Sequence, residues 1–390
     1  MKMLFITSQK QNMTRIYRGL KRLQCTVEAY PKHIEVIRKN EECAHELMNH
    51  LKETSPDLVI SNLFDGVLAT ITHILQIKYA VYCMDSPVFE IYRWEETHFD
   101  NIFFFFFDKR EYERLKAEGC ANIYHMPLAA NVLTTDQIET TKEEMSKYKC
   151  DISFVGSLYS RNTYNQCAET FPAQLKEVLS FIFEQSALQW DGIDRIMPLL
   201  TPEFVALLRS VIPTIENHSK KLMNDMEHIK FSFLGRKLTN IERTLLLELL
   251  ADNYDFRLYT WDAEDVPDNI PRFPQVDFSE SINVFRSTKI NLNITLRSIE
   301  SGVPLRVFDI MGAGGFVLSN WQPEIPELFE DGKEIVTFKT PEEMLEKVDY
   351  YLNHEEERLK IAVNGYRKVK ECYTFEHQLM KIISILYPSP

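Results

Sequence analysis

The sequence predicts an α/β protein of two similar halves, each built on a parallel β-sheet that helices cover on both faces. Short runs rich in β-branched and aromatic residues alternate with longer segments whose apolar residues recur every three or four positions. The alternation pauses over a long helical stretch in the middle of the chain and then resumes. A chain of 390 residues is long enough for two or three domains.

The first half alternates strand and helix from its start. We expect its strands at Met3–Thr7, Cys25–Tyr30, Asp57–Ser61, Tyr79–Cys83, Asn101–Phe107 and Asn122–Met126. We expect the helices between them at Thr14–Leu23, Glu35–Glu53, Val67–Ile77 and Lys109–Glu118. The run of phenylalanines at 103–107 fits a strand in the middle of a doubly covered sheet, which is apolar on both faces, so we assign it to the core.

A polar stretch, Thr134–Tyr148, marks the expected domain boundary. It gives an N-terminal domain at 1–148 and a C-terminal domain at 149–374. From about 160 to 237 the pattern is helical with proline interruptions, which predicts a helical insertion in the second domain. The pattern Thr239-x-x-Glu242 is that of a capping box and predicts a helix from there to about Ala251.

The second half then returns to strands and helices. Its strands are expected at Cys150–Val155, Phe256–Thr260, Lys289–Thr295, Phe316–Ser319 and Ile335–Phe338. Its helices are expected near Leu305–Met311 and at Pro341–Leu352, Glu355–Cys372 and Phe375–Leu386. Two such halves predict a ligand site in a cleft between them, at the carboxyl ends of the strands.

Composition excludes several classes of protein. The net charge of −13 argues against nucleic acid as a partner, because affinity for nucleic acid comes largely from clustered Lys and Arg. The seven cysteines are scattered and form no CxxC pair, which favours reduced thiols over a disulfide framework or a zinc site. No apolar run suits a signal peptide or a membrane span, so we expect a cytoplasmic protein without a transmembrane segment.

Five of the 12 glycines fall between positions 302 and 332, in and after the segment NLNITLRSIESGVPLRVFDIMGAGGFVLSN. The segment is expected to form a strand, a turn at Gly302, and a helix with Pro304 just inside it. The first turn of such a helix is a natural anion site, to which Arg297 and Arg306 would add contacts to a diphosphate. Asp309 would accept hydrogen bonds from a ribose. The alternative is that Arg306 and Asp309 merely pair on a solvated helix face.

The sequence lacks the motifs of several common enzyme classes. There is no GxxxxGK[ST], GxGxxG, HExxH or GxSxG, which removes the usual support for P-loop ATPases, dinucleotide dehydrogenases, zincins and α/β-hydrolases. There is no Asp-x-Asp triplet either, so a metal-dependent sugar-nucleotide site built on paired aspartates has no candidate.

Several segments together resemble the CgeB-like glycosyltransferases, a family named for a spore-maturation protein. The segments SGVPLRVFDIMGAGGFVLSN, PEIPELFEDGKEIV and VDYYLNHEEERLKIAVNGYRKV resemble the nucleotide-sugar domain of that family. Upstream, NIFFFFFDKREYERLKAEG, MPLAAN and DISFVGSLYSRN are similar to it as well. The resemblance covers most of the chain and is weakest in the helical insertion.

The resemblance implies a GT-B fold, in which two Rossmann-like domains face a cleft. The C-terminal domain would hold the donor and the N-terminal domain the acceptor, without a metal, and the helix at 375–390 would cross back to the first domain. By position, Asp309 matches the second carboxylate of an E-x7-E motif found in related retaining enzymes. Ser301 stands in the first place, with Glu300 one residue off, so the stereochemical outcome stays open.

Three further pairs of residues complete the expected site. Gly156 and Ser157 follow a strand, and glycine lets the backbone come close to phosphates. Tyr259 and Thr260 end another strand, where they would border the nucleotide base or serve only as packing. Asp85 is the first choice for the general base on the acceptor side and Asp65 the second. The alternative for Asp85 is that Asp-Ser-Pro forms only a turn.

These features predict an enzyme that moves a hexose-type sugar from a nucleotide sugar, with a UDP-sugar favoured, to a protein, glycan or surface-layer acceptor. Neither a metal nor another cofactor is expected. The rival hypothesis is a non-catalytic nucleotide-sugar-binding or scaffold protein of the same shape, which the absence of Glu at Ser301 supports. A sugar-nucleotide epimerase of the same fold is a third reading.

Overall fold

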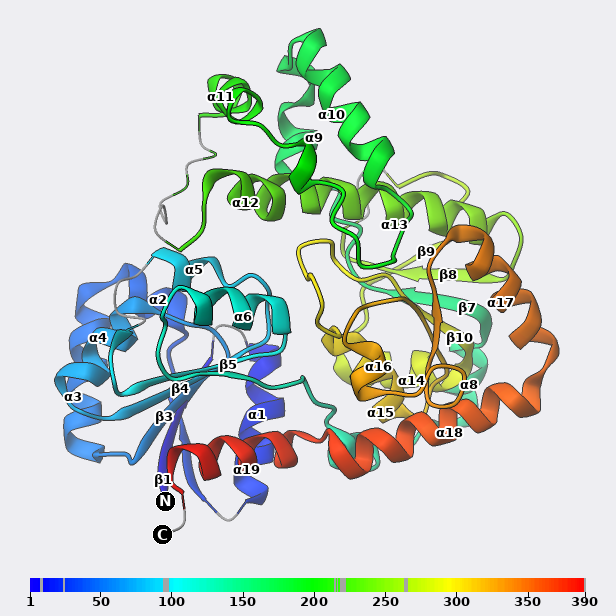
Figure 1. Cartoon of the computed structure of the whole chain (residues 1–390). Coiled ribbons are helices and arrows are strands. Elements are labelled where there is room, and N and C mark those ends of the chain that lie inside the picture. The colour runs from blue at the N-terminus through cyan, green and yellow to red at the C-terminus, as the bar shows by residue number, and fades with distance from the viewer. Residues whose placement is uncertain are drawn as a thin grey trace. The chain divides into compact units, whose positions relative to one another are not determined.

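The computed structural model describes residues 1–7, 10–23, 25–93, 98–213, 215, 217, 222–262 and 266–388. The chain forms two compact units (Figure 1). Unit 1 consists of Met1–Asn131 and Cys372–Pro390, and unit 2 of Val132–Glu371. Each unit holds a six-stranded parallel sheet with helices around it, which confirms the predicted α/β class. Among the described residues, no helix has both the length and the apolar character needed to cross a membrane.

The sheet of unit 1 has the order β2-β1-β3-β4-β5-β6. Its strands are β1 (Lys2–Ile6), β2 (Thr26–Ala29), β3 (Leu58–Ser61), β4 (Lys78–Cys83), β5 (Ile102–Phe106) and β6 (Ile123–His125). Its helices are α1 (Lys10–Arg22), α2 (Ile34–Lys39), α3 (Glu41–Thr54), α4 (Gly66–Ile74), α5 (Phe89–Arg93), α6 (Lys109–Ala117) and α19 (Phe375–Leu386). The β5 side chains Phe104, Phe105 and Phe106 are fully buried, which confirms that the phenylalanine run belongs to the core.

The helix expected at Glu35–Glu53 is in fact two helices, α2 and α3. Asn40 separates them in an extended conformation (φ −136°, ψ 111°), and its side chain accepts a hydrogen bond from Cys43 N at the start of α3. Asn is a strong N-cap residue, so it ends one helix and begins the next although the apolar spacing runs through both.

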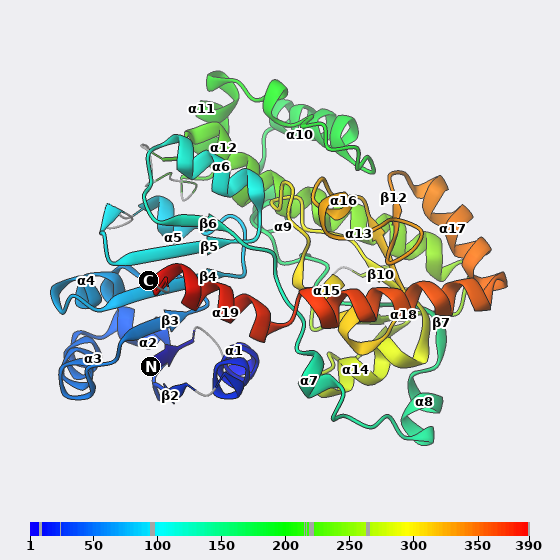
Figure 2. The same cartoon turned by 60° about the horizontal axis from the view of Figure 1, so that its bottom comes forward.

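The C-terminal helix α19 belongs to unit 1, where it packs against α1 (Figure 2). Gly19 allows this approach, because a Cβ there would lie 2.8 Å from Leu379 Cδ1. Arg22 and Glu376 form an ion pair of 2.9 Å between the same two helices. The chain therefore returns to its first unit at the end.

The sheet of unit 2 has the order β12-β11-β10-β7-β8-β9 and is parallel throughout. Its strands are β7 (Cys150–Val155), β8 (Phe256–Tyr259), β9 (Arg272–Phe273), β10 (Thr288–Asn293), β11 (Val317–Asn320) and β12 (Val336–Phe338). In order of appearance this is the 3-2-1-4-5-6 arrangement of doubly wound folds. The strand order reverses between β7 and β10, which are therefore the strands that flank the switch point.

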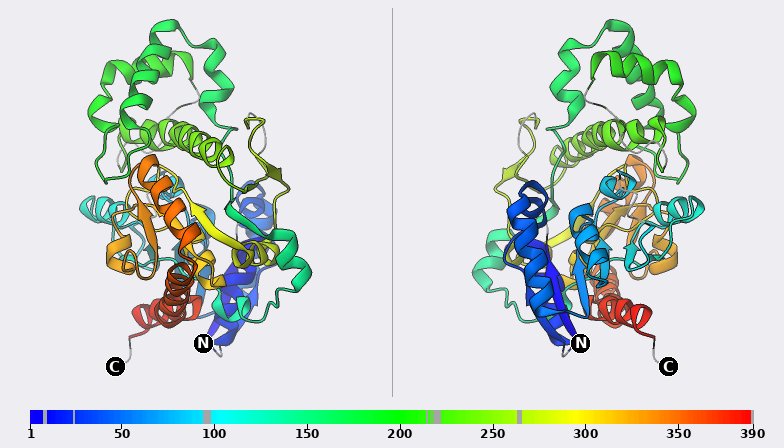
Figure 3. Two further views of the ribbon diagram at one scale, coloured as in Figure 1. Left: turned by 90° about the vertical axis from the view of Figure 1, so that its right-hand side faces the viewer. Right: turned by 90° about the vertical axis from the view of Figure 1, so that its left-hand side faces the viewer.

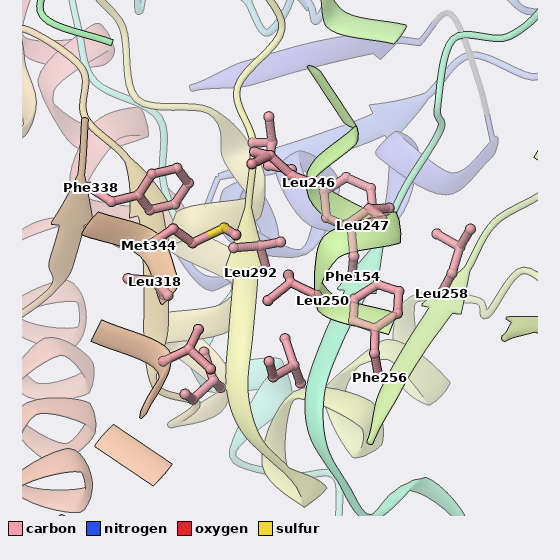
Figure 4. Packing of buried hydrophobic residues seen from close by; sticks show 14 of the residues in the cluster. Phe154, Leu246, Leu247, Leu250, Phe256, Leu258, Leu292, Leu318, Phe338 and Met344 are labelled. Carbon is pink, nitrogen blue, oxygen red and sulfur yellow. The ribbon is translucent and has the colours of Figure 1, made fainter. Parts of the chain in front are cut away.

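The helices of unit 2 cover both faces of this sheet. They are α7 (Val132–Thr135), α8 (Lys142–Tyr148), α9 (Thr163–Cys167), α10 (Ala173–Ser186), α11 (Pro202–Val211), α12 (Asp225–Ile229), α13 (Gly235–Ala251), α14 (Phe278–Ser287), α15 (Leu305–Ala313), α16 (Ile325–Leu328), α17 (Pro341–Asn353) and α18 (Glu355–Cys372). Figure 4 shows Leu246, Leu247 and Leu250 of α13 packed on side chains of β7, β8 and β10. This cluster is the core beneath the carboxyl ends of the central strands.

The predicted helical insertion is present as α9 to α12. Its apolar side chains form a hydrophobic cluster separate from the one that covers the sheet. Figure 3 shows these green helices gathered as a group of their own. A π-helical turn, Lys230–Leu234, then leads directly into α13.

The boundary between the compact units lies at 131/132 and not at 148/149 as predicted. The polar stretch that was read as a linker contains α7 and α8, which are fastened to unit 2. Arg286 of α14 donates hydrogen bonds to Thr135 O at 3.0 Å and to Ile138 O, and Asn283 Nδ2 donates to Glu144 at 2.8 Å. A polar sequence was therefore compatible with short helices on a domain surface.

The predicted capping box at Thr239 is wrong. Helix α13 begins four residues earlier, at Gly235, and Thr239 lies inside it, where its hydroxyl donates to Gly235 O at 2.7 Å. Pro304 is also one residue out of place, since it is the N-cap of α15 and not its first residue. Both side chains of the supposed box are buried and contact the loop that follows β10.

Candidate functional site

The candidate site lies at the carboxyl ends of β7 and β10 in unit 2. In open α/β sheets, ligands bind outside the carboxyl ends of the strands at the switch point. The loop after β7 starts with Gly156, and the loop after β10 runs to Pro304, where α15 begins. The two loops therefore leave the sheet side by side, since their strands are paired neighbours.

Gly156 and Arg306, both predicted site residues, meet at this point. A Cβ on Gly156 would lie 2.2 Å from Arg306 Nη2 and 2.7 Å from Arg306 Cζ, so the guanidinium occupies the space over the glycine. Such distances are far below van der Waals contact. Residue 156 must therefore be glycine if Arg306 is to keep this position.

The guanidinium of Arg306 is held without an acid. Its Cζ lies 5.0 Å from the centroid of the Phe154 ring. Within the described part of the chain it makes no hydrogen bond and no ion pair, so the predicted alternative of a pair with Asp309 does not form. Burial lowers the pKa of Arg306, while Tyr159 and Asp309 act in the opposite direction. The side chain is half-buried, and a cation that is partly removed from water without an acid partner would be stabilised by an anion.

A second arginine at this point, Arg243, is buried and was missed by the sequence analysis. Its Nε donates to Ile294 O at 3.1 Å and its Nη1 donates to Ser157 O, so one side chain joins the loop after β10 to the loop after β7. Its Cζ lies 5.2 Å from the Phe154 ring and 5.1 Å from the Tyr159 ring. Burial lowers the pKa of Arg243 to about 9, and the nearby charge of Arg306 acts in the same direction.

Ser157 and Thr260 are brought together by a carboxylate that the sequence analysis did not single out. Asp262 is 1% exposed, and it accepts hydrogen bonds from Ser157 Oγ at 3.0 Å and from Ser160 N at 2.9 Å. Its own N–H donates to Thr260 Oγ1 at 3.0 Å. These contacts fix the loops after β7 and β8 against each other, which gives Ser157 and Thr260 a structural role at the rim of the site.

Tyr259, predicted to border a nucleotide base, lies in the core. It is 3% exposed and packs with Tyr148 of α8 and Phe273 of β9. Side chains alternate between the two faces of a strand, so Tyr259 points to the α8 face while its neighbours do not. The packing alternative that the sequence left open is the one the structure supports.

Arg297, predicted to bind a diphosphate, is occupied by Glu242 of α13. Its Nε lies 2.8 Å from Glu242 Oε2 and 3.1 Å from Oε1, and Glu242 is fully buried. Its Nη2 also donates to Gln189 O at 2.8 Å. These hydrogen bonds tie the side chain to α13 and to the segment that follows α10.

The turn before α15 is buried and carries Ser301 and Gly302. Ser301 Oγ donates to Glu324 Oε1 at 2.7 Å, and Glu300 pairs with Lys230 at 2.7 Å. The first N–H groups of a helix have no intrahelical partner and carry the positive end of its dipole. These groups of α15 begin beside Gly302, on the same turn as Arg306, and half-buried Asp309 follows one turn later.

The acid candidates of unit 1 differ in exposure. Asp65 is 1% exposed, caps α4 by accepting from Leu68 N at 3.0 Å, and pairs with Arg38 Nε at 2.8 Å. Asp85 is exposed at the carboxyl end of β4. Asp65 therefore stabilises the fold from a buried position, whereas Asp85 lies on the surface.

A buried carboxyl that was missed lies beneath the Asp85 loop. Glu111 of α6 is 1% exposed and accepts from Val88 N at 2.9 Å. Burial and the nearby Asp108 raise the pKa of Glu111 to about 8. No sequence pattern distinguishes Glu111, because a Glu at this position of a predicted helix looks the same as one on the helix surface.

Comparison with known proteins agrees with this architecture. Residues 220–384, less than half of the chain, match a family model described as glycosyl transferase-like. No curated protein sequence is significantly similar to the chain.

Two solved structures are similar over nearly the whole chain. Sucrose-phosphate synthase from Thermosynechococcus elongatus has a TM-score of 0.56 at 8% identity, covering 99% of this chain and 98% of that one. HepE from Anabaena, in complex with UDP-glucose, has a TM-score of 0.53 at 9% identity, covering 99% and 100%. The fold is therefore GT-B, as the resemblance implied.

Proposed function

We propose that this protein is a glycosyltransferase of the CgeB-like type, which transfers a hexose-type sugar from a nucleotide sugar to an acceptor. The observation that carries the proposal is the half-buried guanidinium of Arg306. It stands over Gly156 at the switch point of unit 2 and has no acid partner among the described residues. An anion that approached the first turn of α15 would meet both the helix dipole and this guanidinium.

The diphosphate of the donor is the anion that fits this chemistry. Cleavage of the bond between the anomeric carbon and the diphosphate leaves extra negative charge on the leaving group. Arg306 and the first N–H groups of α15 would bind that charge more strongly in the transition state than in the ground state. Arg243 adds a second positive charge, which carbonyl oxygens hold in place and which no carboxylate of the described residues bonds.

Three finer points belong to the same proposal. We favour a UDP-sugar as donor, because HepE, which shares the fold, is in complex with UDP-glucose. Transfer without a metal follows from the resemblance, with the arginines as the positive charges at the diphosphate. The acceptor would be a protein, glycan or surface-layer component bound by unit 1.

Asp85 is the proposed general base for an inverting reaction. Its carboxylate is exposed where β4 ends, so an acceptor hydroxyl can reach it. Asp65 already caps α4 and pairs with Arg38, so the proposal does not use it.

A second candidate is a nucleotide-sugar-binding protein without turnover. The specific observation in its favour is Ser301, which stands where the resemblance implies a carboxylate and whose hydroxyl is bound to Glu324. It would bind the donor by the same groups and release no sugar.

The test is a calorimetric titration with UDP, GDP and dTDP, followed by a donor-hydrolysis assay. We expect at least one nucleoside diphosphate to bind, and Arg306→Ala to weaken its affinity about 10- to 100-fold through the loss of charge-assisted hydrogen bonds. Arg195→Ala is the control, because Arg195 pairs with Asp191 on the surface of the insertion. No binding by any of the three would refute the proposal, and binding without hydrolysis or transfer would favour the second candidate.

A further inference from the structure

We propose that the buried Glu242–Arg297 pair is a positioning device that holds the loop between β10 and α15 on helix α13, and that neither side chain contacts the donor. The inference rests on the proposed function, because its effect is read at the nucleotide site. It replaces the role of Arg297 that the sequence suggested. Four observations support it. The pair makes its hydrogen bonds within unit 2, and one face of α13 contacts the loop. Glu242 also binds the segment after α10, and only a short stretch of chain separates Arg297 from Arg306.

Both side chains of the pair form their hydrogen bonds within unit 2. Arg297 Nε reaches both oxygens of Glu242, at 2.8 and 3.1 Å, and its Nη2 donates to Gln189 O at 2.8 Å and to the same carboxylate. The Arg297 side chain is 19% exposed and that of Glu242 is fully buried. Because such a bidentate pair is strong and directional, it fixes where the guanidinium lies.

One face of α13 contacts the loop at successive turns. Thr239 Oγ1 accepts a hydrogen bond from Arg297 N at 2.9 Å, and a Cβ on Gly235 would lie 3.4 Å from Ser298 N. Arg243, one residue after Glu242, holds Ile294 O at 3.1 Å. Spacings of four, three and one place these α13 residues on a single face, so the helix acts as a template for the loop.

The same pair also fastens the segment that follows α10. Leu188 N donates to Glu242 Oε1 at 2.8 Å, and Leu188 has a left-handed φ of 59°, which a Leu side chain rarely adopts. The Arg297 Cζ lies 5.2 Å from the Trp190 ring. Glu242 is therefore a junction of three segments, and the helical insertion is tied to the loop of the nucleotide site through it.

The path from this junction to Arg306 is short and restrained. The loop runs from Arg297 to Pro304, and on the way Glu300 is held by Lys230 at 2.7 Å. Lys230 is also paired with Asp194 of the insertion at 2.7 Å. Because the loop ends in the first turn of α15, its position sets where the Arg306 guanidinium stands over Gly156.

The test is a double-mutant cycle with Glu242→Gln, Arg297→Gln and the double variant. The affinity for UDP is measured by calorimetry, and kcat and KM are measured for hydrolysis of UDP-glucose. We expect each single variant to weaken UDP binding about tenfold and the double variant to be no worse than either, since both break the same device. In an Arg306→Ala background, Arg297→Gln should have no further effect on UDP affinity.

Other outcomes would overturn the inference. If Arg297 contacted the diphosphate, Glu242→Gln would free it and keep or tighten UDP binding, while Arg297→Gln would weaken it. If the pair served stability alone, Tm would fall while the UDP affinity, kcat and KM stayed as in the unaltered protein. Failure of the unaltered protein to bind UDP, GDP or dTDP would refute the proposed function instead.

Two further variants test whether the charge of Arg297 matters and whether the loss of any buried arginine has the same effect. Arg297→Lys retains the charge opposite Glu242, so it should recover part of the UDP affinity that Arg297→Gln loses, and no recovery would count against positioning by the ion pair. Arg358→Gln is the matched control, because Arg358 is a buried arginine of α18 that donates to Tyr351 O at 2.8 Å. It should lower Tm and leave UDP affinity unchanged.

Discussion

The two units carry the same kind of sheet but differ in the charged side chains at the carboxyl ends of their strands. In unit 1 the strand order reverses between β1 and β3, where Thr7 Oγ1 donates to Asn62 Oδ1 at 3.2 Å and Asp65 is paired with Arg38. In unit 2 it reverses between β7 and β10, where Arg306 has no acid partner among the described residues. The first switch point is closed by internal bonds and the second is open to an anion.

This contrast shows that topology alone does not place a ligand. Both sheets offer a switch point, yet among the described residues only the one in unit 2 holds arginines, Arg306 and Arg243, that no carboxylate pairs with. Among the described residues, the buried carboxyls near the strand ends of unit 1 are Asp65, Asp108 and Glu111. Under the proposed function, unit 2 would bind the diphosphate and unit 1 the hydroxyl-bearing acceptor.

The largest expected effect lies in unit 1. Asp85→Asn should lower kcat for sugar transfer to water or an acceptor by about 10² to 10⁴, as the loss of a general base does. Tm should stay the same, because Asp85 is exposed. Unchanged turnover of Asp85→Asn would place the base elsewhere.

Asp65→Asn is the matched comparison for that prediction. The Asp65 carboxylate is buried and holds both the α4 cap and Arg38, so its change should destabilise the protein by about 1–3 kcal/mol in urea unfolding. The remaining folded protein should turn over normally. The reverse pattern for the two aspartates would mean that the roles assigned to them are exchanged.

The next effect lies in unit 2. Gly156→Ala should weaken binding of a nucleoside diphosphate about 10- to 100-fold, because the new Cβ would stand 2.2 Å from Arg306 Nη2 and displace the guanidinium. Gly332→Ala is the control, since a Cβ there meets nothing within 4 Å, although its φ of 77° makes it mildly destabilising. If Gly156→Ala bound the nucleotide as tightly as the unaltered protein, the anion would not lie over this glycine.

The smallest effect concerns the pH dependence of stability. The pKa of Glu111 is raised to about 8 from its ordinary value of 4.5, first by burial and then by Asp108. Between these two values the folded protein keeps a proton that the unfolded chain has lost. The free energy of unfolding should therefore fall as pH rises from 4.5 to 8, by at most about 1.4 kcal/mol per pH unit from this group.

Glu111→Gln tests that statement in urea unfolding at a series of pH values. The amide cannot ionise and keeps an oxygen for Val88 N, so the slope between pH 5 and 8 should become shallower by the contribution of Glu111. An unchanged slope would mean that another group accounts for the pH dependence.

Much of the fold could be predicted from the sequence, because parallel strands buried on both faces leave strong local signals. The strands of unit 1 and the long helices of unit 2 were found in this way. The strand β9 has only two residues, too few to show a pattern, and the helix α14 was overlooked although Phe278, Ile282 and Phe285 follow the helical spacing. The break at Asn40 was missed because one capping side chain outweighed a continuous apolar pattern.

The site was predicted less completely, for a physical reason. Gly156 and Arg306 were both selected, but their contact joins positions 150 residues apart and no local pattern shows it. Arg297 and Glu242 are 55 residues apart, and a Thr-x-x-Glu spacing looks alike at a helix start and inside a helix. Whether an arginine is free or paired is decided by tertiary contacts, which is why Arg297 was selected and Arg243 was overlooked.

The most direct test of the central claim is a crystal structure with UDP bound. We expect diphosphate oxygens about 3 Å from the Arg306 guanidinium and from the first N–H groups of α15, beside Gly156 and Gly302. A diphosphate bound instead after β1 of unit 1, at the first βα turn of the chain, would contradict it.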